Sequence, residues 1–242
     1  MKTLQLFIAL SILISCGKES SCPGSTGEII FEERILDEFE KISVLGDVEL
    51  VLKKDSLQSV RLECGENLAQ SIRTEVIDGE LIVDNSLTCN WLRDLNTPIR
   101  LHISSSQLNY IYHEGQKDIR TEGSFSCNSF SILAEGSNSK INLTMNCQDL
   151  DIVQSASNCS IELKGYCSNL YSFNSGTGSI LAAEMACEEA FVTNQSSGRI
   201  EVNALQILKA HIYNTGDIYY KSSPDSINFK VFHPGTGLFI PL

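Results

Sequence analysis

Four cysteines at a fixed interval form the sharpest chemical pattern in the sequence. The interval is 20 residues, and the cysteines are Cys127, Cys147, Cys167 and Cys187. If one interval is one turn of a stacked β fold, consecutive thiols lie about 4.8 Å apart, which a disulfide tolerates. Two arrangements are open: disulfides within the first and the second pair, or an inward stack of reduced thiols that pack as small apolar side chains. We favour the stack, because Ile207 and Ile227 continue the same series.

Neither the cysteines nor the histidines are spaced as the ligands of a metal ion would be. Four thiols in one line suit zinc poorly, because zinc prefers a tetrahedron of ligands. His113-Glu114 lacks the second histidine that an HExxH zinc motif requires. We therefore predict neither a metal site nor a cofactor. Cys64 and Cys89 flank a predicted β-hairpin and are the best candidates for a disulfide.

The sequence also lacks the motifs and residue pairs that are typical of catalytic sites. The sequence contains no G-x-S-x-G nucleophile motif and no phosphate-binding glycine loop. Asp149 and Asp151 are followed 20 residues later by Asn169 and Tyr171. No two carboxylates are therefore stacked on neighbouring turns there, as a glycosidase pair would require. We predict no catalytic residue and a protein that is not an enzyme.

The 20-residue interval extends to apolar residues that identify the elements carrying these side chains. Three and five residues after each position of the cysteine series stand pairs that share one face of a strand. The pairs are Phe130/Ile132, Leu150/Ile152, Leu170/Ser172, Ala190/Val192 and Ala210/Ile212. A second set of such pairs follows a turn and runs from Ile141/Leu143 to Ile218/Tyr220. Units of this kind bury their apolar face only by stacking on the next unit, so the sequence predicts an all-β parallel β-helix, or β-solenoid, with rungs of about 20 residues.

The turns between the two sets are rich in small residues. Asn138 and Asn158 stand at the first two turns, and Gly178, Gly198 and Gly216 stand at the later ones. Asparagine and glycine accept positive φ more readily than other residues do. We therefore expect positive φ at these turns.

The chain before the repeat is also β, but the 20-residue register is absent from it. Residues 31–103 contain alternating apolar residues and an Asp78-Gly79 hairpin turn. This irregular N-terminal β segment either continues the solenoid or caps its end, and an open end invites aggregation. We divide the chain into a signal peptide (1–15), a tether (16–30), the N-terminal segment or cap (31–103) and the solenoid repeats (104–242).

The first residues predict export and lipidation. Lys2 precedes an apolar stretch from Leu4 to Ile14, which is too short to cross a bilayer as a helix but suits a secretory signal. The letters LISC, which end at Cys16, look like a bacterial lipobox. Two or three acyl chains on Cys16 would hold the protein in the cell envelope at the outer membrane, surface-exposed or periplasmic. An ordinary signal peptide cleaved nearby is the alternative.

The acidic balance of the chain limits its partners. The formal net charge is −12, and the sequence contains no run of basic residues. Binding to phosphate groups needs concentrated Lys and Arg. Nucleic acid and anionic lipid head groups are therefore excluded as predicted partners.

Aromatic side chains gather on one predicted outer face of the repeat. In the 20-residue register they form a candidate interaction surface, which consists of Tyr171, Phe173, Phe191, His211 and Tyr213. Exposed apolar patches of this kind mark interaction sites. Aromatic platforms suit sugar rings or the surface of another protein. The alternative is that the N-terminal β segment or a second copy of the chain covers this face.

Several segments resemble a known family. The lipobox, the stretches FEKISVLGDVELVL (39–52) and VIDGELIV (76–83), and the Gly-x-Ile turns that begin at Gly178, Gly198 and Gly216 resemble the bacterial head-GIN-domain family, labelled putative auto-transporter adhesins. The resemblance covers most of the mature chain and depends on the order of these motifs. It implies a right-handed β-helix at the cell surface or in the periplasm, without a catalytic mechanism. The chain departs from the family in its many cysteines and in Asn138 and Asn158, which replace glycine.

Together these features favour a non-enzymatic envelope lipoprotein that works as an adhesion or ligand-binding module for a glycan or a protein. The alternative is a structural envelope component that self-associates as a homodimer through the aromatic face. A carbohydrate-active β-helix enzyme is a distant third.

Overall fold

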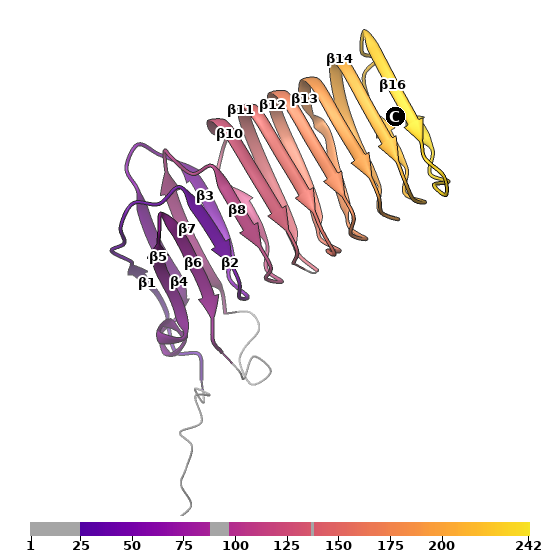
Figure 1. The fold of residues 1–242 in the computed structure, drawn as a ribbon. Coiled ribbons are helices and arrows are strands. Elements are labelled where there is room, and N and C mark those ends of the chain that lie inside the picture. Colours follow the sequence, from indigo (N-terminus) through magenta and orange to yellow (C-terminus); the bar gives the residue numbers. More distant parts are fainter. Residues whose placement is uncertain (1–24, 88–96, 137) are drawn as a thin grey trace, which may run out of the picture.

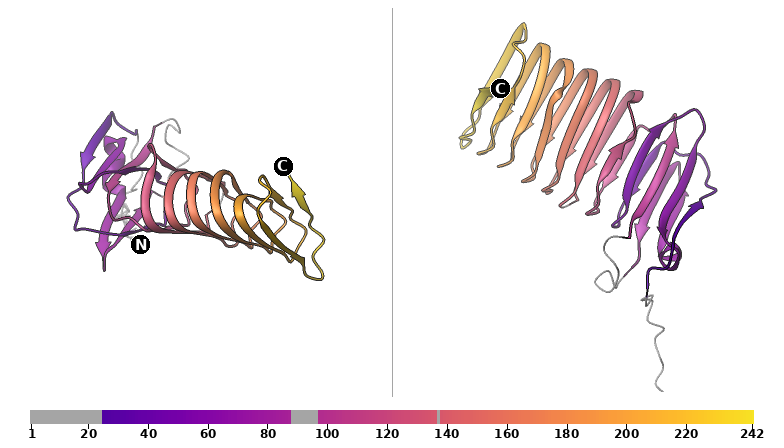
Figure 2. Two further views of the ribbon diagram at one scale, coloured as in Figure 1. Left: turned by 90° about the horizontal axis from the view of Figure 1, so that it is seen from above. Right: turned by 180° about the vertical axis from the view of Figure 1, so that it is seen from behind.

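The structure is a β-solenoid. This computed structural model describes residues 25–87, 97–136 and 138–242. Within these ranges the regular elements are strands, apart from one 3-10 helix, η1 (Glu66–Ser71). The strands form about seven turns, which stack in a row from one end of the molecule to the other (Figures 1 and 2). The predicted fold class is confirmed.

Two largely parallel sheets form the broad faces of the solenoid. The front sheet is nearer the viewer in Figure 1. It begins, in spatial order, with β6 (Glu80–Asn85), β2 (Lys41–Val44), β8 (Tyr110–His113) and β10 (Phe125–Ala134). It continues with the second halves of β11 (Lys140–Gln154), β12 (Ser160–Asn174), β13 (Ser179–Asn194) and β14 (Ile200–Ile212), and it ends with β16 (Ser226–Val231). The back sheet contains β7 (Ile99–Ser105), β3 (Glu49–Lys54), β9 (Ile119–Thr121), the first halves of β11 to β14, β15 (Ile218–Tyr220) and β17 (Phe239–Pro241). Each of the strands β11 to β14 therefore passes around one edge of the solenoid and supplies both faces.

The interior between the sheets is filled by apolar side chains, which alternate with more exposed ones along strands such as β11 and β12. In β11 the inward residues include Ile141, Leu143, Leu150 and Ile152, all at most 1% exposed. The equivalent positions of β12 and β13 are buried too. The predicted inward pairs therefore point into the core, and stacking of the turns removes them from water.

The N-terminal segment both extends the solenoid and closes it. β2 pairs in parallel with β6 and β8, and β3 pairs in parallel with β7 and β9, so this turn lies between two others. Three strands run antiparallel to their neighbours: β1 (Ile29–Glu33), β4 (Ser59–Gly65) and β5 (Ile72–Ile77). The β5–β6 hairpin turns at Asp78-Gly79, where both residues have positive φ. Parallel turns thus begin before residue 104, with an antiparallel cap beside them.

From the edge of the solenoid through the front sheet, the 20-residue register ends at β13, so the predicted continuation of the cysteine series is wrong. The four cysteines of the series do lie side by side on β10 to β13. Cys187, however, pairs with Ala204 rather than with Ile207, and Ile227 pairs with Leu208. The pairing of β13 with β14 is irregular where the strands turn the edge, because β14 has fewer residues there. The later columns of the front sheet shift as a result, whereas Ile180, Ile200 and Ile218 of the back sheet pair as predicted.

The cysteines of this column carry free thiols in the structure. Cys147, Cys167 and Cys187 are buried, whereas Cys127 is partly exposed. A hydrogen bond from Cys147 holds the pKa of the Cys127 thiol below its ordinary value, and nearby Lys54 adds to this effect. Cys64 is buried with a free thiol. Its predicted partner Cys89, the lipid acceptor Cys16 and the signal segment lie outside the described residues.

Buried amides hold the turns that lead from the front sheet to the back sheet. Asn174 and Asn194 are fully buried on neighbouring strands. Asn174 donates an Nδ2–H to the carbonyl oxygen of Gly178 at 2.9 Å and accepts the N–H of Gly176 at 3.0 Å. On the preceding turn, Gln154 Nε2 donates to the carbonyl of Cys159 at 2.7 Å. One inward column of amides therefore satisfies backbone groups that would otherwise be orphaned in the core.

The glycines at these turns serve a different purpose from the predicted one. Positive φ occurs at Asn138, as expected, but at the next turn it falls on Ala156 instead of Asn158. Gly178 and Gly198 do not have positive φ. A Cβ atom on Gly198 would overlap the carbonyl oxygen of Gly178 on the neighbouring turn. Glycine is required here because consecutive turns approach each other closely, so the expectation of positive φ at these glycines is wrong.

Candidate functional site

One outward column of the front sheet carries two short polar side chains between aromatic ones. Consecutive turns place side by side Tyr110, Ser131, Asp151, Tyr171, Phe191 and Lys209. Neighbouring strands lie about 4.8 Å apart, so Tyr110 and Tyr171, three strands apart, are separated by roughly 14 Å. The shorter side chains of Ser131 and Asp151 occupy the space between the two tyrosines.

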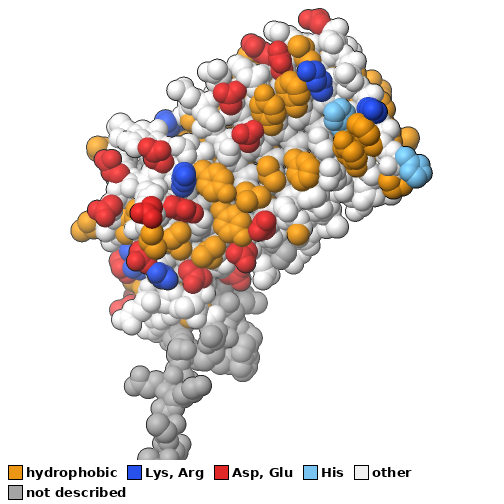
Figure 3. Space-filling view, viewed as in Figure 1, with side chains coloured by type: hydrophobic (Ala, Val, Ile, Leu, Met, Phe, Trp, Pro, Cys, Tyr) orange, Lys and Arg blue, Asp and Glu red, His pale blue; other side chains and the backbone are white. Residues whose placement is uncertain are grey.

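An apolar groove of about 500 Å³ lies over this stretch. The neighbouring outward column supplies its second side with Leu133, Val153 and Phe173. We call it the Tyr171 groove, and its lining also includes Tyr110, Ser131, Asp151, Phe191 and Thr193. Figure 3 shows hydrophobic side chains gathered on this face, with acidic side chains around them.

The aromatic wall of the groove is rigidly stacked. The rings of Tyr171 and Phe191 lie 5.1 Å apart between centroids at an angle of 9°. Lys209 Nζ lies 4.6 Å from the centroid of Phe191. One face of Tyr171 is therefore covered by Phe191, and its other face looks back along the column toward Asp151. Tyr171 is 45% exposed and lines the groove, so a ligand in the groove can contact its ring.

The floor of the groove carries one carboxylate. Ser131 Oγ donates a hydrogen bond to Asp151 Oδ2 at 3.3 Å. Both side chains are partly buried beside the aromatic wall. A carboxylate in such a place accepts strong hydrogen bonds from ligand hydroxyl or amino groups. The groove thus combines a flat apolar face with a polar acceptor beside it.

A second hollow, of about 650 Å³, adjoins the groove beyond Tyr110. Lys41, Ser43, Glu80 and Tyr112 contribute to its lining. Tyr112 donates its hydroxyl to Glu135 at 2.9 Å. Burial raises the pKa of Tyr110, and the charges of Glu80 and Glu135 raise it further. Lys41 offsets one of these two carboxylates, so this end of the groove keeps a net negative charge.

His211 and Tyr213 do not join the groove, because the register shift moves them. His211 pairs with Thr193 instead of following Phe191. Tyr213 stacks on Phe232 with centroids 4.4 Å apart, His211 packs edge-on against both rings, and Lys230 Nζ lies 4.3 Å from the Phe232 centroid. The single predicted aromatic face is therefore two separate stacks, each capped by a lysine.

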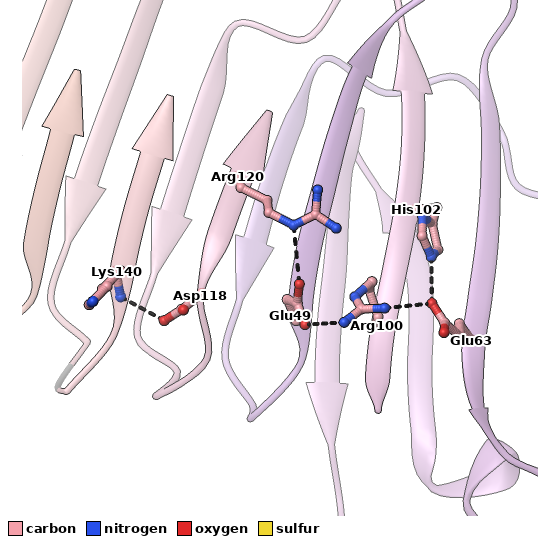
Figure 4. Close-up of polar contacts among 7 residues, drawn as sticks. All are labelled: Glu49, Glu63, Arg100, His102, Asp118, Arg120 and Lys140. Carbon is pink, nitrogen blue, oxygen red and sulfur yellow. Dashed lines mark hydrogen bonds and ion pairs between the residues drawn. The ribbon is translucent and has the colours of Figure 1, made fainter. Parts of the chain in front are cut away.

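A cluster of ion pairs on the back sheet ties the cap to the solenoid (Figure 4). Arg100 contacts Glu49 at 3.0 Å and Glu63 at 2.9 Å. Glu63 also accepts a hydrogen bond from His102 at 2.8 Å, and Arg120 contacts Glu49 at 3.4 Å. Burial opposes ionisation of Glu63, but the bonds from His102 and Arg100 outweigh it, so its pKa lies below the ordinary value. Both carboxylates are engaged by arginine, which suits a structural role.

Tyr110 and Lys209, at the two ends of the outward column that contains Tyr171, were not predicted by the sequence analysis. Tyr110 stands 21 residues before Ser131, so a comparison that tolerates one extra residue would have found it. Lys209 follows Phe191 by 18 residues instead of 20, because β14 is shorter than β13. No pattern in the sequence indicates this shorter interval.

Two negative observations concern the described residues alone. They contain no group of three or more His, Cys, Asp or Glu side chains that could hold a metal ion. Nor do they contain a helix with the length and apolar character needed to cross a bilayer.

Comparison with known proteins identifies a family whose model matches most of the chain. The profile of the family described as "Putative auto-transporter adhesin, head GIN domain" matches residues 38–224. No curated protein matches the sequence.

Solved structures share the fold. A putative adhesin from Bacteroides fragilis is 19% identical, with a TM-score of 0.80 and coverage of 90% of this chain and 99% of that one. A putative adhesin from Parabacteroides distasonis is 21% identical, with a TM-score of 0.68 and the same coverage. A protein from the same species, described as a putative lipid binding protein, is 21% identical, with a TM-score of 0.58 and coverage of 88% and 97%. At these identities the likeness concerns the fold.

Proposed function

Because the chain belongs to the head-GIN-domain family of auto-transporter adhesins, we propose that it is a non-enzymatic adhesion module of the cell envelope that binds a glycan in the Tyr171 groove. The observation that carries this proposal is the exposed ring of Tyr171 beside the carboxylate of Asp151 in the same groove. A sugar ring has an apolar face that packs on an aromatic ring, and hydroxyl groups at its edge. The groove offers a partner for each.

The charge of the face selects the class of glycan. Asp151 lies in the groove, and Glu80 and Glu135 lie at the Tyr110 end. A sialylated or sulfated sugar would bring its negative charge toward these carboxylates, which costs free energy. We therefore propose a neutral glycan, or one with an amino group.

A hydrolytic role has no support from the lining of the groove. Glycoside hydrolysis needs two carboxyl groups roughly 5 to 10 Å apart. Among the residues that the structure describes, Asp151 is the one acidic residue that lines the Tyr171 groove. Binding without turnover is the function that this arrangement supports.

The experiment is a glycan array probed with the chain from Gly17 onward, which keeps every described residue. Wild type should bind at least one neutral glycan, and Tyr171→Ser should weaken that binding at least tenfold. Tyr213→Ser is the matched control, because it removes an exposed tyrosine that directly follows β14 and lies outside the groove. Binding that Tyr171→Ser leaves intact, or selective binding of acidic glycans, would refute the proposal.

We also propose that acylation of Cys16 attaches the protein to the outer membrane. The support is the lipobox sequence that ends at this residue. The full precursor should partition into the detergent phase after Triton X-114 extraction of cells, and Cys16→Ser should move it to the aqueous phase. Equal partitioning of the two forms would contradict lipidation.

A further inference from the structure

The last turn of the solenoid exposes its interior. β16 pairs with β14, and β17 pairs with β15, so each has one occupied edge. All six residues of β16 are exposed. No other described strand pairs with β16 or β17 on the far side, and Figures 1 and 2 show them at the end of the row.

In this last turn, even the side chains that point toward the interior of the solenoid are exposed. Ile227, Phe229 and Val231 continue the inward column of β14, and they are 44%, 37% and 39% exposed. Phe229 stacks on Phe239 of β17 with centroids 4.6 Å apart. An apolar surface with a free strand edge beside it is the kind of surface that proteins cover. A solenoid needs a polar terminal unit to remain soluble by itself.

The opposite end of the molecule shows how this chain covers a solenoid end. The antiparallel strands β1, β4 and β5 and the helix η1 pack there. Leu68 and Ile72 of this cap are at most 2% exposed. Nothing equivalent covers β16 among the described residues. If the C-terminal end of one copy stacked on the N-terminal end of another, it would have to displace this cap. Two copies can therefore associate more readily through their C-terminal ends.

The charge of the C-terminal end permits two copies to approach. The whole chain has a formal charge of −12, but from Lys221 onward its Asp, Glu, Lys and Arg residues are only Lys221, Asp225 and Lys230. This end is therefore close to neutral and slightly basic. Two acidic molecules repel each other least when they meet through such ends.

We propose that two copies of this chain associate tail to tail, with β16 of one copy pairing antiparallel with β16 of the second. The sequence SINFKV is self-complementary when this pairing is centred on Asn228. Ile227 of each copy then stands opposite Phe229 of the other, and Lys230 stands opposite Ser226. The exposed core side chains of the two copies then bury each other, and the interface resembles the hydrophobic core of a single domain. This inference is independent of the Tyr171 groove, which stays open in the pair.

The test is size-exclusion chromatography with light scattering across a concentration series of the chain from Gly17 onward. Wild type should form a dimer, and Ile227→Glu/Val231→Glu should raise its dissociation constant at least tenfold. Both side chains are already exposed in the single chain, so circular dichroism should show unchanged folding. Ile77→Glu is the matched control, because Ile77 is an isoleucine 48% exposed at the capped end.

A second variant locates the symmetry axis. Asn228→Cys places a thiol where the two strands cross the axis, and it should yield a covalent dimer under mild oxidation. Ser106→Cys, an exposed position distant from β16, should not yield one beyond the wild-type level. A monomer at all concentrations would overturn the proposal. So would a dimer that survives Ile227→Glu/Val231→Glu, including one that Tyr171→Ser/Phe191→Ser abolishes, because that result assigns the contact to the aromatic face.

Discussion

Asn194 donates an Nδ2–H to the carbonyl oxygen of Gly198 at 2.8 Å, inside the core. Its Oδ1 accepts the backbone N–H of Ser196 at 3.1 Å. Asn194→Ala leaves the buried N–H of Ser196 without this acceptor, and it leaves the carbonyl oxygen of Gly198 with only the longer bond from Ser196 Oγ at 3.3 Å. We therefore expect the unfolding free energy to fall by about 2–4 kcal/mol. Chemical denaturation measures this. Asn146→Ala, which removes an exposed asparagine bonded to Ser124, should cost about 0.5 kcal/mol or less.

Gly198 should tolerate no side chain. The Cβ of Gly198→Ala would overlap the backbone of Gly178, which cannot move without disturbing the neighbouring turn. We expect a loss of more than about 4 kcal/mol or an insoluble protein. Gly123→Ala is the control, because Gly123 has φ of 77° but open space around it. It should cost only about 1–2 kcal/mol, and comparable losses for the two variants in a solubility and denaturation series would contradict this explanation.

Acid should destabilise the fold partly through His113. Burial lowers the pKa of His113 to about 4, and the backbone of Lys117 and the carboxylates of Asp118 and Asp47 offset this only in part. Its Nε2 contacts Ser139 Oγ at 3.0 Å. The unfolded chain, with an ordinary histidine pKa of about 6.5, therefore binds more protons between these values. The free energy of unfolding should therefore be highest above about pH 6.5, and the contribution of His113 to it should fall by about 3 kcal/mol as the pH decreases toward 4.

The variant His113→Gln isolates this contribution. Its denaturation midpoint should change less between pH 6.5 and 5 than that of wild type, even if it is less stable at pH 7. Carboxylates with lowered pKa, such as Glu63, lose their contribution at lower pH and affect both proteins alike. Parallel pH profiles for the two proteins would show that His113 does not carry the effect.

Thiol reactivity should follow burial along the cysteine column. Cys127 is partly exposed and its pKa is lowered by the hydrogen bond from Cys147, so it should react first with iodoacetamide. Burial raises the pKa of Cys64 to about 11 and that of Cys159 above its ordinary value. Mass-spectrometric peptide mapping should find Cys127 alkylated in the folded protein, and Cys64, Cys159 and Cys167 only after denaturation. Blocked Cys127 and Cys147 that react only after reduction would instead indicate a disulfide between the turns.

Local patterns in the sequence determined the fold class and much of the core. Alternation by two residues follows from strand geometry, so Ile141 and Leu143 could be assigned to the interior without any knowledge of their neighbours. The period from Cys127 to Cys187 predicted which residues lie side by side, because each turn repeats the same path. The same register placed Tyr171 next to Phe191.

Tertiary structure alone decided where that register ends and which residues complete the groove. The pairing of β13 with β14 depends on how the strands pack around the edge of the solenoid, and this moved His211 beside Thr193 and Lys209 beside Phe191. Tyr110 joined the column because β8 pairs with β10. Insertion of β2 between β6 and β8 depends on contacts between segments distant in the chain. A local pattern specifies which face a side chain occupies, but only packing between turns specifies its neighbour.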